Sequence, residues 1–115
     1  MAEFKNTMGI GKIAFSVNIQ AYCPLGKDWY TNKVLVEFYP NEVIPDYCEV
    51  EKELRAMAGQ ELTVEGCVAQ VFDHLAETYK PNRLLVKSYA DDAVHFPVEV
   101  MKERILAEAF DEDTN

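Results

Sequence analysis

Two early stretches of the chain alternate between apolar and polar residues, as half-buried β-strands do. In residues 12–22 the apolar side chains occupy every second position, from Ile13 to Ala21, with polar side chains between them. Residues 32–39 alternate in the same way. Residues 23–28, which lie between these stretches, contain a proline and a glycine that favour a turn. The period of two predicts two strands paired as a hairpin.

The middle of the chain changes to the period of a helix. Residues 45–57 repeat apolar side chains three or four positions apart, behind a proline that suits a first helical turn. Residues 63–79 carry a wider apolar stripe, and Thr63 has a side chain that can cap a helix. Gly59 and Pro81 stand where these two segments end. The pattern predicts two successive helices.

Strand-like alternation returns after the second predicted helix. Residues 83–89 and 94–100 each predict a strand, with Asp91 and Asp92 as the turn between them. From Met101 onward the spacing is partly helical and the chain ends in an acidic run. We therefore expect residues 101–115 to form an acidic tail that frays at its end.

The predicted order is β-β-α-α-β-β, an α+β unit in which two helices cover one face of an antiparallel sheet. The 115 residues have the length of a single domain, with residues 1–11 as an N-terminal segment. The other face of the sheet is expected to carry Val, Phe or Tyr at alternate positions. Because an exposed apolar sheet face usually marks an interface, we expect another subunit to cover it.

The charge of the chain narrows the choice of partners. The 20 acidic and 11 basic residues give a formal charge of −9. Such a chain repels a nucleic-acid backbone, so the charge excludes a general polyanion binder. A protein that binds a small ligand in a local pocket remains consistent with the charge. No apolar run approaches the roughly 20 residues that span a bilayer, and the first residues lack an apolar signal core. We expect a cytoplasmic protein without a membrane partner.

The three cysteines are widely spaced, form no C-x-x-C pair and lie near no histidine in a metal-binding pattern, so we expect no metal site. Cys23 ends the first predicted strand close to Lys27, and a nearby cation can activate a thiol as a nucleophile. The alternative for Cys23 is a small buried hydrophobe. Cys67 lies on the apolar stripe of the second helix, where a core position is expected, and Cys48 fits either interpretation.

Glu65 falls in the first turn of the second predicted helix, where the helix dipole favours a carboxylate. Its two oxygens also suit the N–H and amino donors at the edge of a guanine-like base. A solvated surface acid and a base-binding acid both fit this position. His74 and His95 have no partner in the sequence pattern, and we expect each to be structural or solvated.

Three short motifs occur in an order and spacing that resemble a known family. Cys23-Pro24 ends a long strand, residues 34–40 form a strand that stops at a proline, and residues 64–67 open a helix as Val-Glu-Gly-Cys. From about residue 21 to residue 98 the chain resembles the tunnelling-fold (T-fold) enzymes. Among these it is most similar to the NADPH-dependent 7-cyano-7-deazaguanine reductases of queuosine synthesis and to the related archaeal amidinotransferases that make archaeosine. The resemblance implies a T-fold unit that assembles into homo-oligomeric rings.

The resemblance also assigns roles to residues. Cys23 matches the family's nucleophile, and Glu65 matches the glutamate that holds the deazaguanine base. The family's catalytic aspartate lies seven residues after its cysteine. Tyr30 occupies that position here, so Asp28, two residues earlier, is the candidate acid. Tyr30 is a further candidate for substrate binding. Asp46, the position at which the reductase signature would begin, is another.

The chain departs from the reductases where those enzymes bind NADPH. Cys48 and Glu51 replace the lysines that would meet the NADPH phosphates, and Val64 replaces the histidine before the base-binding glutamate. An acidic residue there would repel a phosphate. The resemblance therefore favours an enzyme without a cofactor, in which Cys23 forms a thioimide with the nitrile of 7-cyano-7-deazaguanine and ammonia converts it to a formamidine.

Two alternatives to the amidinotransferase remain open. One is NADPH-dependent reduction of the nitrile to the aminomethyl compound. The other is a non-catalytic oligomeric module that binds a deazaguanine or a pterin. The ligand would be the free 7-deazaguanine, its nucleoside or a modified nucleic acid.

Overall fold

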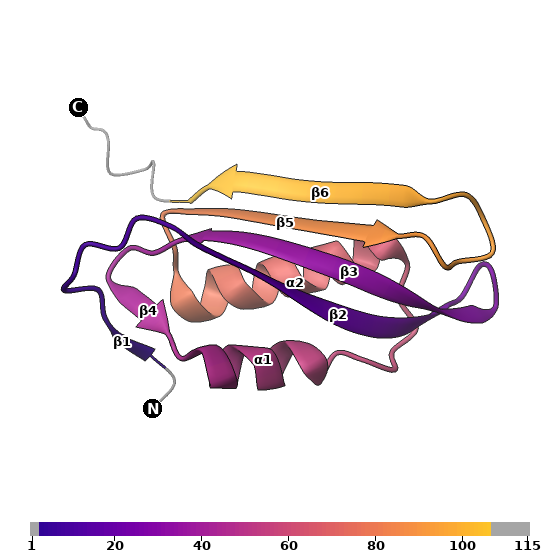
Figure 1. The fold of residues 1–115 in the computed structure, drawn as a ribbon, viewed down its shortest axis with the longest axis horizontal. Helices are drawn as coiled ribbons and strands as arrows, with labels where there is room; N and C mark the ends of the chain where they lie inside the picture. Colours follow the sequence, from indigo (N-terminus) through magenta and orange to yellow (C-terminus); the bar gives the residue numbers. More distant parts are fainter. Residues whose placement is uncertain (1–2, 107–115) are drawn as a thin grey trace.

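The computed structural model describes residues 3–106, which form an antiparallel sheet with two helices packed against one face (Figure 1). In chain order the elements are β1 (Glu3–Lys5), β2 (Ile13–Cys23), β3 (Asp28–Tyr39), β4 (Val43–Pro45), α1 (Tyr47–Arg55), α2 (Val64–Tyr79), β5 (Arg83–Ala90) and β6 (Val98–Ile105). The long strands lie in the order β2-β3-β5-β6, and β1 pairs with β4 as a separate two-stranded sheet. All these strand pairs are antiparallel. The predicted α+β class and the order of the long elements are confirmed.

The alternation along the strands places one face of the sheet against the helices. Val17, Ile19 and Ala21 of β2 are buried, while the residues between them are exposed. β3 and β5 follow the same period. Burial of one valine or isoleucine side chain in this layer stabilises the fold by about 1.5–3 kcal/mol. The core is therefore the single apolar layer between the sheet and the two helices.

Both helices begin where the sequence supplies a capping side chain. The carboxylate of Asp46 accepts a hydrogen bond from the Cys48 N–H at 2.9 Å, and the hydroxyl oxygen of Thr63 accepts one from the Gly66 N–H at 3.0 Å. These bonds satisfy backbone donors that a first turn leaves without partners. α2 then buries the apolar stripe predicted for it: Val64, Cys67, Val68, Val71, Phe72, Leu75 and Tyr79.

A short polar network crosses the core close to the end of β2. Asn32 and Ser88 are both fully buried, and the Ser88 hydroxyl donates to the Asn32 side-chain oxygen at 3.0 Å. The Asn32 amide in turn donates to the Ile19 carbonyl at 3.3 Å. Because buried polar groups are costly without partners, this network fixes the alignment of β2, β3 and β5.

The hairpin at the start of the sheet is longer than predicted. β3 begins at Asp28, four residues earlier than expected, and Trp29 lies opposite Tyr22 of β2. The two rings pack edge to face with centroids 5.4 Å apart, a geometry that stabilises aromatic pairs. Only residues 24–27 remain as the turn.

The last strand is shifted along the sequence from its predicted place. It begins at Val98, not at residue 94, and residues 91–97 form a loop because Pro97 cannot donate a ladder hydrogen bond. It continues to Ile105, so the prediction of a tail from Met101 is wrong for residues 101–105, which pair with β5. Residues 107–115, which carry the acidic run, lie outside the described residues.

The prediction missed β1 and β4, and it misjudged the uncovered face of the sheet. β1 and β4 have three residues each, too few to display an alternation. The valines and phenylalanine of β3 point toward the helices, so the uncovered face is mixed and not apolar. It combines charged and polar side chains with a few large apolar ones: Ser16, Asn18, Lys33, Leu35, Glu37, Leu85, Lys87, Tyr89, Glu99 and Met101.

Three segments that are distant in sequence meet at one end of the sheet. Figure 1 shows the β2–β3 turn, the β5–β6 loop and the beginning of α2 at this end, away from β1 and β4. Within residues 3–106, no helix is long and apolar enough to cross a membrane.

Candidate functional site

A hollow with about 530 Å³ of free space, part of it open solvent, lies where these three segments meet. Its lining is mostly apolar, with one thiol, one carboxylate, one phenol and one imidazole: Cys23, Leu25, Tyr30, Thr63, Val64, Glu65, Ala93, His95 and Val98. We refer to it as the Cys23 hollow.

Backbone pairing brings Cys23 beside the start of α2. The Tyr22 N–H donates to the Gln60 carbonyl at 2.9 Å, and the Leu62 N–H donates to the Tyr22 carbonyl at 3.0 Å. Glu61 thereby forms a parallel bridge with Tyr22. The residues just before the Thr63 cap therefore extend the sheet by one short segment, and the first turn of α2 lies next to the end of β2.

The sulfur of Cys23 faces a backbone donor. The Gly26 N–H points at Cys23 Sγ from 3.3 Å, and the Lys27 N–H donates to the Cys23 carbonyl at 2.7 Å. Lys27 adopts a left-handed φ of 55°, which closes this tight turn. The sulfur is partly buried and is not in a disulfide. A donor aimed at sulfur would interact favourably with a thiolate, so the geometry suits a nucleophile.

Glu65 presents an exposed carboxylate at the rim of the same hollow. It lies in the first turn of α2, which Thr63 caps. No side-chain hydrogen bond or ion pair between residues 3 and 106 engages it. Two carboxylate oxygens remain able to accept hydrogen bonds from a ligand. Cys23 and Glu65, predicted as nucleophile and base-binding residue, are thus brought together.

Tyr30 lines the hollow as a buried phenol. Only 2% of it is exposed, and its hydroxyl donates to the Leu62 carbonyl at 2.6 Å. Burial is the largest cause that raises the pKa of Tyr30 above its usual value. The phenol therefore stays protonated, and its proton is committed to a backbone carbonyl. Tyr30 shapes the wall and has a free oxygen lone pair, but it is a poor proton donor to a ligand.

The other two predicted site residues lie elsewhere in the chain. Asp28 is opposite Cys23 in the β2–β3 pairing, but it is exposed, does not line the hollow and accepts a hydrogen bond from the Trp29 N–H at 2.8 Å. Asp46 caps α1 and lines no part of the hollow. Within one chain, the structure brings neither carboxylate into the wall of the Cys23 hollow.

His95 belongs to the hollow, although the sequence pattern gave it no partner. The expected strand over residues 94–100 would have placed it in a regular sheet, whereas it lies exposed in the loop of residues 91–97 and lines the hollow. The signal that could have found it is Pro97, which is unfavourable inside a strand. A loop between Asp91 and Pro97 could have been predicted from that residue.

The remaining thiols and the second histidine have different surroundings. Cys67 is fully buried in the core, and burial raises the pKa of its thiol to about 11, so its predicted core position is confirmed. Cys48 is exposed at the first turn of α1. His74 Nε2 lies 2.8 Å from a Glu53 oxygen, which also accepts from the Tyr79 hydroxyl at 2.8 Å. These contacts join α1 to α2. Within residues 3–106, no group of three or more metal-ligating side chains is assembled.

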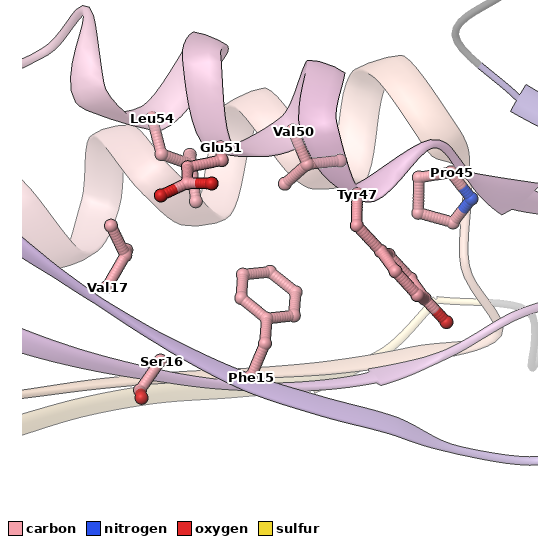
Figure 2. A pocket seen from close by; sticks show the side chains of 8 residues that line it. All are labelled: Phe15, Ser16, Val17, Pro45, Tyr47, Val50, Glu51 and Leu54. Atoms are coloured by element: carbon pink, nitrogen blue, oxygen red, sulfur yellow. The ribbon is translucent and has the colours of Figure 1, made fainter.

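A second hollow, of about 580 Å³, lies between α1 and the edge strand β2. Figure 2 shows Phe15 and Val17 of β2 below Tyr47, Val50 and Leu54 of α1, with the Glu51 carboxylate directed into the space between them. It contains no thiol and no imidazole. We refer to it as the α1–β2 groove.

Comparison with known proteins identifies the fold but not a sequence family. No family model matches the chain, and no curated protein matches it. Among solved structures, the chain is similar to the crystal structure of the archaeosine synthase QueF-Like in the apo form. The two share 19% sequence identity and superpose with a TM-score of 0.75 over 82% of this chain and 93% of that one. At this identity the likeness establishes a common fold, and the chain therefore has the α+β T-fold architecture of the QueF-Like archaeosine synthase.

Proposed function

We propose that the Cys23 hollow binds a 7-cyano-7-deazaguanine group and that Cys23 attacks its nitrile carbon. The observation that carries the proposal is the meeting of Cys23 and Glu65 in one hollow, with the Gly26 N–H directed at the sulfur. A nitrile carbon is electrophilic, and addition of a thiolate gives a covalent thioimide. The likeness of the fold to an archaeosine synthase supports this reading.

Glu65 would hold the base. A guanine-like ring presents a ring N–H and an amino group side by side, and one carboxylate can accept both hydrogen bonds in parallel. The carboxylate lies in the first turn of α2, next to the positive end of the helix dipole. The apolar walls contributed by Val64, Ala93 and Val98 would then cover the faces of a flat ring.

Ammonia is the proposed second reactant. Its nitrogen would add to the thioimide carbon, the C–S bond would break, and the product would be a formamidine with Cys23 regenerated. Reduction by NADPH is less well supported, because Asp46 caps α1 and its first two turns carry Glu49 and Glu51 where phosphates would need cations. Lys52, the cation of these turns, is paired with Glu49 at 3.6 Å. The residues present do not fit that cofactor, and we assign it no step.

The substrate is proposed to be the free base or a nucleoside. A chain with a formal charge of −9 would need a local basic surface to hold a nucleic acid. A non-catalytic base-binding module is the second candidate function, favoured by the Tyr30 phenol at the position where the resemblance expects a catalytic aspartate.

Product analysis tests the second step. Incubation with 7-cyano-7-deazaguanine and ammonium should give the formamidine, one ammonia heavier than the nitrile by mass spectrometry. Incubation with NADPH should leave the nitrile unchanged. Formation of the aminomethyl compound with NADPH would show a reductase, and no product in either reaction would favour the binding module.

We also propose that the chain assembles head to tail through its sheet edges. β2 and β6 are the two outer strands and run in opposite directions, so β2 of one copy can extend the sheet beside β6 of the next in the same antiparallel alternation. Repetition of such a contact closes a ring when the rotation permits. A paired edge would also remove the exposed backbone donors of both strands.

The α1–β2 groove supports this contact, because it borders the free edge of β2 (Figure 2). Arg104 of β6 lies opposite the buried Leu84, so it shares the helix side of the sheet. In a neighbouring copy it would approach Glu51. Wild-type protein should sediment as a multiple of 13.1 kDa, and Glu51→Arg should lower that mass by placing like charges together. A monomeric wild type would contradict the assembly.

A further inference from the structure

His95 is a proton-carrying side chain in the Cys23 hollow that the sequence motifs do not assign. It comes from the β5–β6 loop, whereas Cys23 comes from the end of β2 and Glu65 from the start of α2. The other titratable side chains of the lining are Tyr30, Cys23 and Glu65. Cys23 and His95 thus line the same hollow, and a histidine that acts as the base for a thiol is a recurring pairing in nucleophilic catalysis.

The loop that carries His95 is tied to the sheet at its start. At its start, the Asp92 carboxylate accepts a hydrogen bond from the Thr31 N–H at 2.9 Å, which lowers the pKa of Asp92, and Asp91 forms an ion pair with Lys33 at 3.2 Å. Both contacts tie the loop to β3. The start of the loop that carries His95 is therefore fixed to β3 by two side-chain contacts.

The same loop packs against the turn that presents the sulfur. A Cβ placed on Gly26 would lie 2.8 Å from Val94 Cγ2 and 3.7 Å from Cys23 Sγ. Val94 therefore occupies the space next to Gly26 that any larger residue would need. This contact joins the loop of residues 91–97 directly to the Cys23 turn.

The ring of His95 is oriented by a backbone carbonyl. Its Nδ1 lies 2.7 Å from the Phe96 carbonyl oxygen, which can only accept a hydrogen bond. We assign the proton of the neutral ring to Nδ1 on this basis. Nε2 then has an available lone pair, and it can accept one proton and return it.

The competing proton carriers are less suitable. The Tyr30 proton is committed to the Leu62 carbonyl, and Asp28 lies outside the hollow with an oxygen bonded to the Trp29 N–H. Glu65 is expected to accept hydrogen bonds from the base. His95 is the remaining side chain of the lining whose proton-accepting atom has no bond within residues 3–106.

We propose that His95 transfers the proton between Cys23 and the nitrogen of the substrate, an inference that rests on the proposed nitrile chemistry. Nε2 takes the thiol proton while the sulfur electron pair forms the C–S bond. One π pair of the nitrile moves to nitrogen, which takes the proton from Nε2. The net result is addition of S–H across the C≡N bond, with His95 neutral again.

The second half-reaction uses the same atom. Ammonia adds to the thioimide carbon, Nε2 accepts a proton from the added nitrogen, and the C–S bond breaks with its electron pair on sulfur. Nε2 then returns the proton to the sulfur. The formamidine leaves, and neither an oxidant nor a reductant is needed. General acid–base help of this kind is typically worth about 10²–10⁴-fold in rate.

Thiol alkylation tests the proton transfer without any nitrile. Iodoacetamide would be added between about pH 5 and pH 9, a range that spans histidine titration, and the rate at each cysteine would be followed by peptide mass spectrometry. Cys48, exposed on α1, and Cys67, buried in the core, are internal references for accessibility and folding. His74→Gln is the matched histidine control, since His74 lies on α2 against Glu53.

We expect His95→Gln to slow alkylation of Cys23 at least about tenfold at neutral pH and to change the pH dependence of that rate. Cys48 should react as before, and Cys67 should stay protected. Added imidazole should restore the Cys23 rate in His95→Ala. An unchanged rate and pH dependence at Cys23 in His95→Gln, or no rescue by imidazole, would overturn the inference.

A parallel assay separates this inference from the proposed function. If wild type and His95→Gln form the nitrile adduct equally fast, the proton-transfer role is wrong while the nitrile chemistry stands. If Cys23 alkylation depends on His95 but no adduct forms with 7-cyano-7-deazaguanine, the His95–Cys23 relation stands and the proposed substrate is wrong.

Discussion

The Cys23 hollow and the α1–β2 groove have similar sizes, about 530 and 580 Å³, and both have mostly apolar walls. They differ in the polar side chains that line them and in the number of chain segments that supply those side chains. The groove is built from one helix and the strand beside it, and its single charged side chain, Glu51, is paired with Arg55 at 2.8 Å. The hollow collects a thiol, a free carboxylate and an imidazole from three separate segments. Both sites are therefore apolar depressions, and the hollow is distinguished by its reactive side chains.

The difference has a structural origin. The groove lies along the edge strand β2, between that strand and α1, and its lining comes from these two elements and Pro45 (Figure 2). The hollow lies at the end of the sheet, where loops and a helix start direct polar groups inward. Loops on a rigid scaffold commonly carry binding residues for this reason.

The difference between the two sites is tested most strongly by neutralising one glutamate in the Cys23 hollow and one in the α1–β2 groove. Glu65→Gln should weaken binding of 7-deazaguanine about 100-fold, because the amide replaces two charge-assisted acceptors with one neutral acceptor and one donor. Glu51→Gln should leave the affinity within about twofold, since that side chain lies in the groove. Isothermal titration calorimetry on the two variants measures this directly. Equal losses would show that the hollow is not the base site.

The stability of the protein at alkaline pH tests the burial of the core thiol, Cys67. The pKa of Cys67 is raised by burial from 9.0 to about 11, so folding favours the protonated thiol. This preference adds about 2–3 kcal/mol to the free energy of unfolding. The stabilisation is complete below about pH 9 and is lost as the pH rises toward 11. The pKa of Tyr79 is raised too, which adds to the loss at higher pH.

Urea unfolding between these pH values provides the measurement. Cys67→Val should flatten the fall in unfolding free energy that wild type shows as the pH rises. A fall that is equally steep in Cys67→Val and in wild type would show that the Cys67 thiol is not its cause.

A smaller effect on the reaction of Cys23 is expected when a larger residue replaces Gly26 in the turn after Cys23. Gly26→Ala places a methyl group against Val94, so the Val94 side chain or the β5–β6 loop that carries it has to shift. We expect about tenfold slower adduct formation, because misplacement of a catalytic group by a fraction of an ångström lowers the rate. Gly11→Ala is the matched control, since no atom lies within 4 Å of its added Cβ. Identical rates in the two variants would show that the loop does not position the site.

Much of the fold could be predicted because it is local in sequence. The alternation from Ile13 to Ala21 and the capped stripe of α2 determine their own elements, and both are found as predicted. The start of β6 could not be placed, because Val94 and Phe96 continue the strand pattern but lie exposed in a loop. Their alternation matched a strand, while Pro97 and the bonds of Asp92 to β3 decided the outcome.

The site could be predicted only in part. Cys23 and Glu65 stand in motifs with a recognisable order, so the sequence was enough to single them out. His95 reaches the hollow through hydrogen bonds of Asp91 and Asp92 to β3, which no sequence period encodes. The placement of Asp28 outside the hollow follows from the early start of β3, which takes that residue into the ladder.

The central claim is covalent attack by Cys23 on a nitrile, and one measurement tests it most directly. Wild-type protein is incubated with 7-cyano-7-deazaguanine, without NADPH or ammonium, and its intact mass is recorded. The account predicts a gain equal to one ligand, absent in Cys23→Ser and retained in Cys48→Ser. No gain in wild type, or a gain that survives in Cys23→Ser, would contradict it.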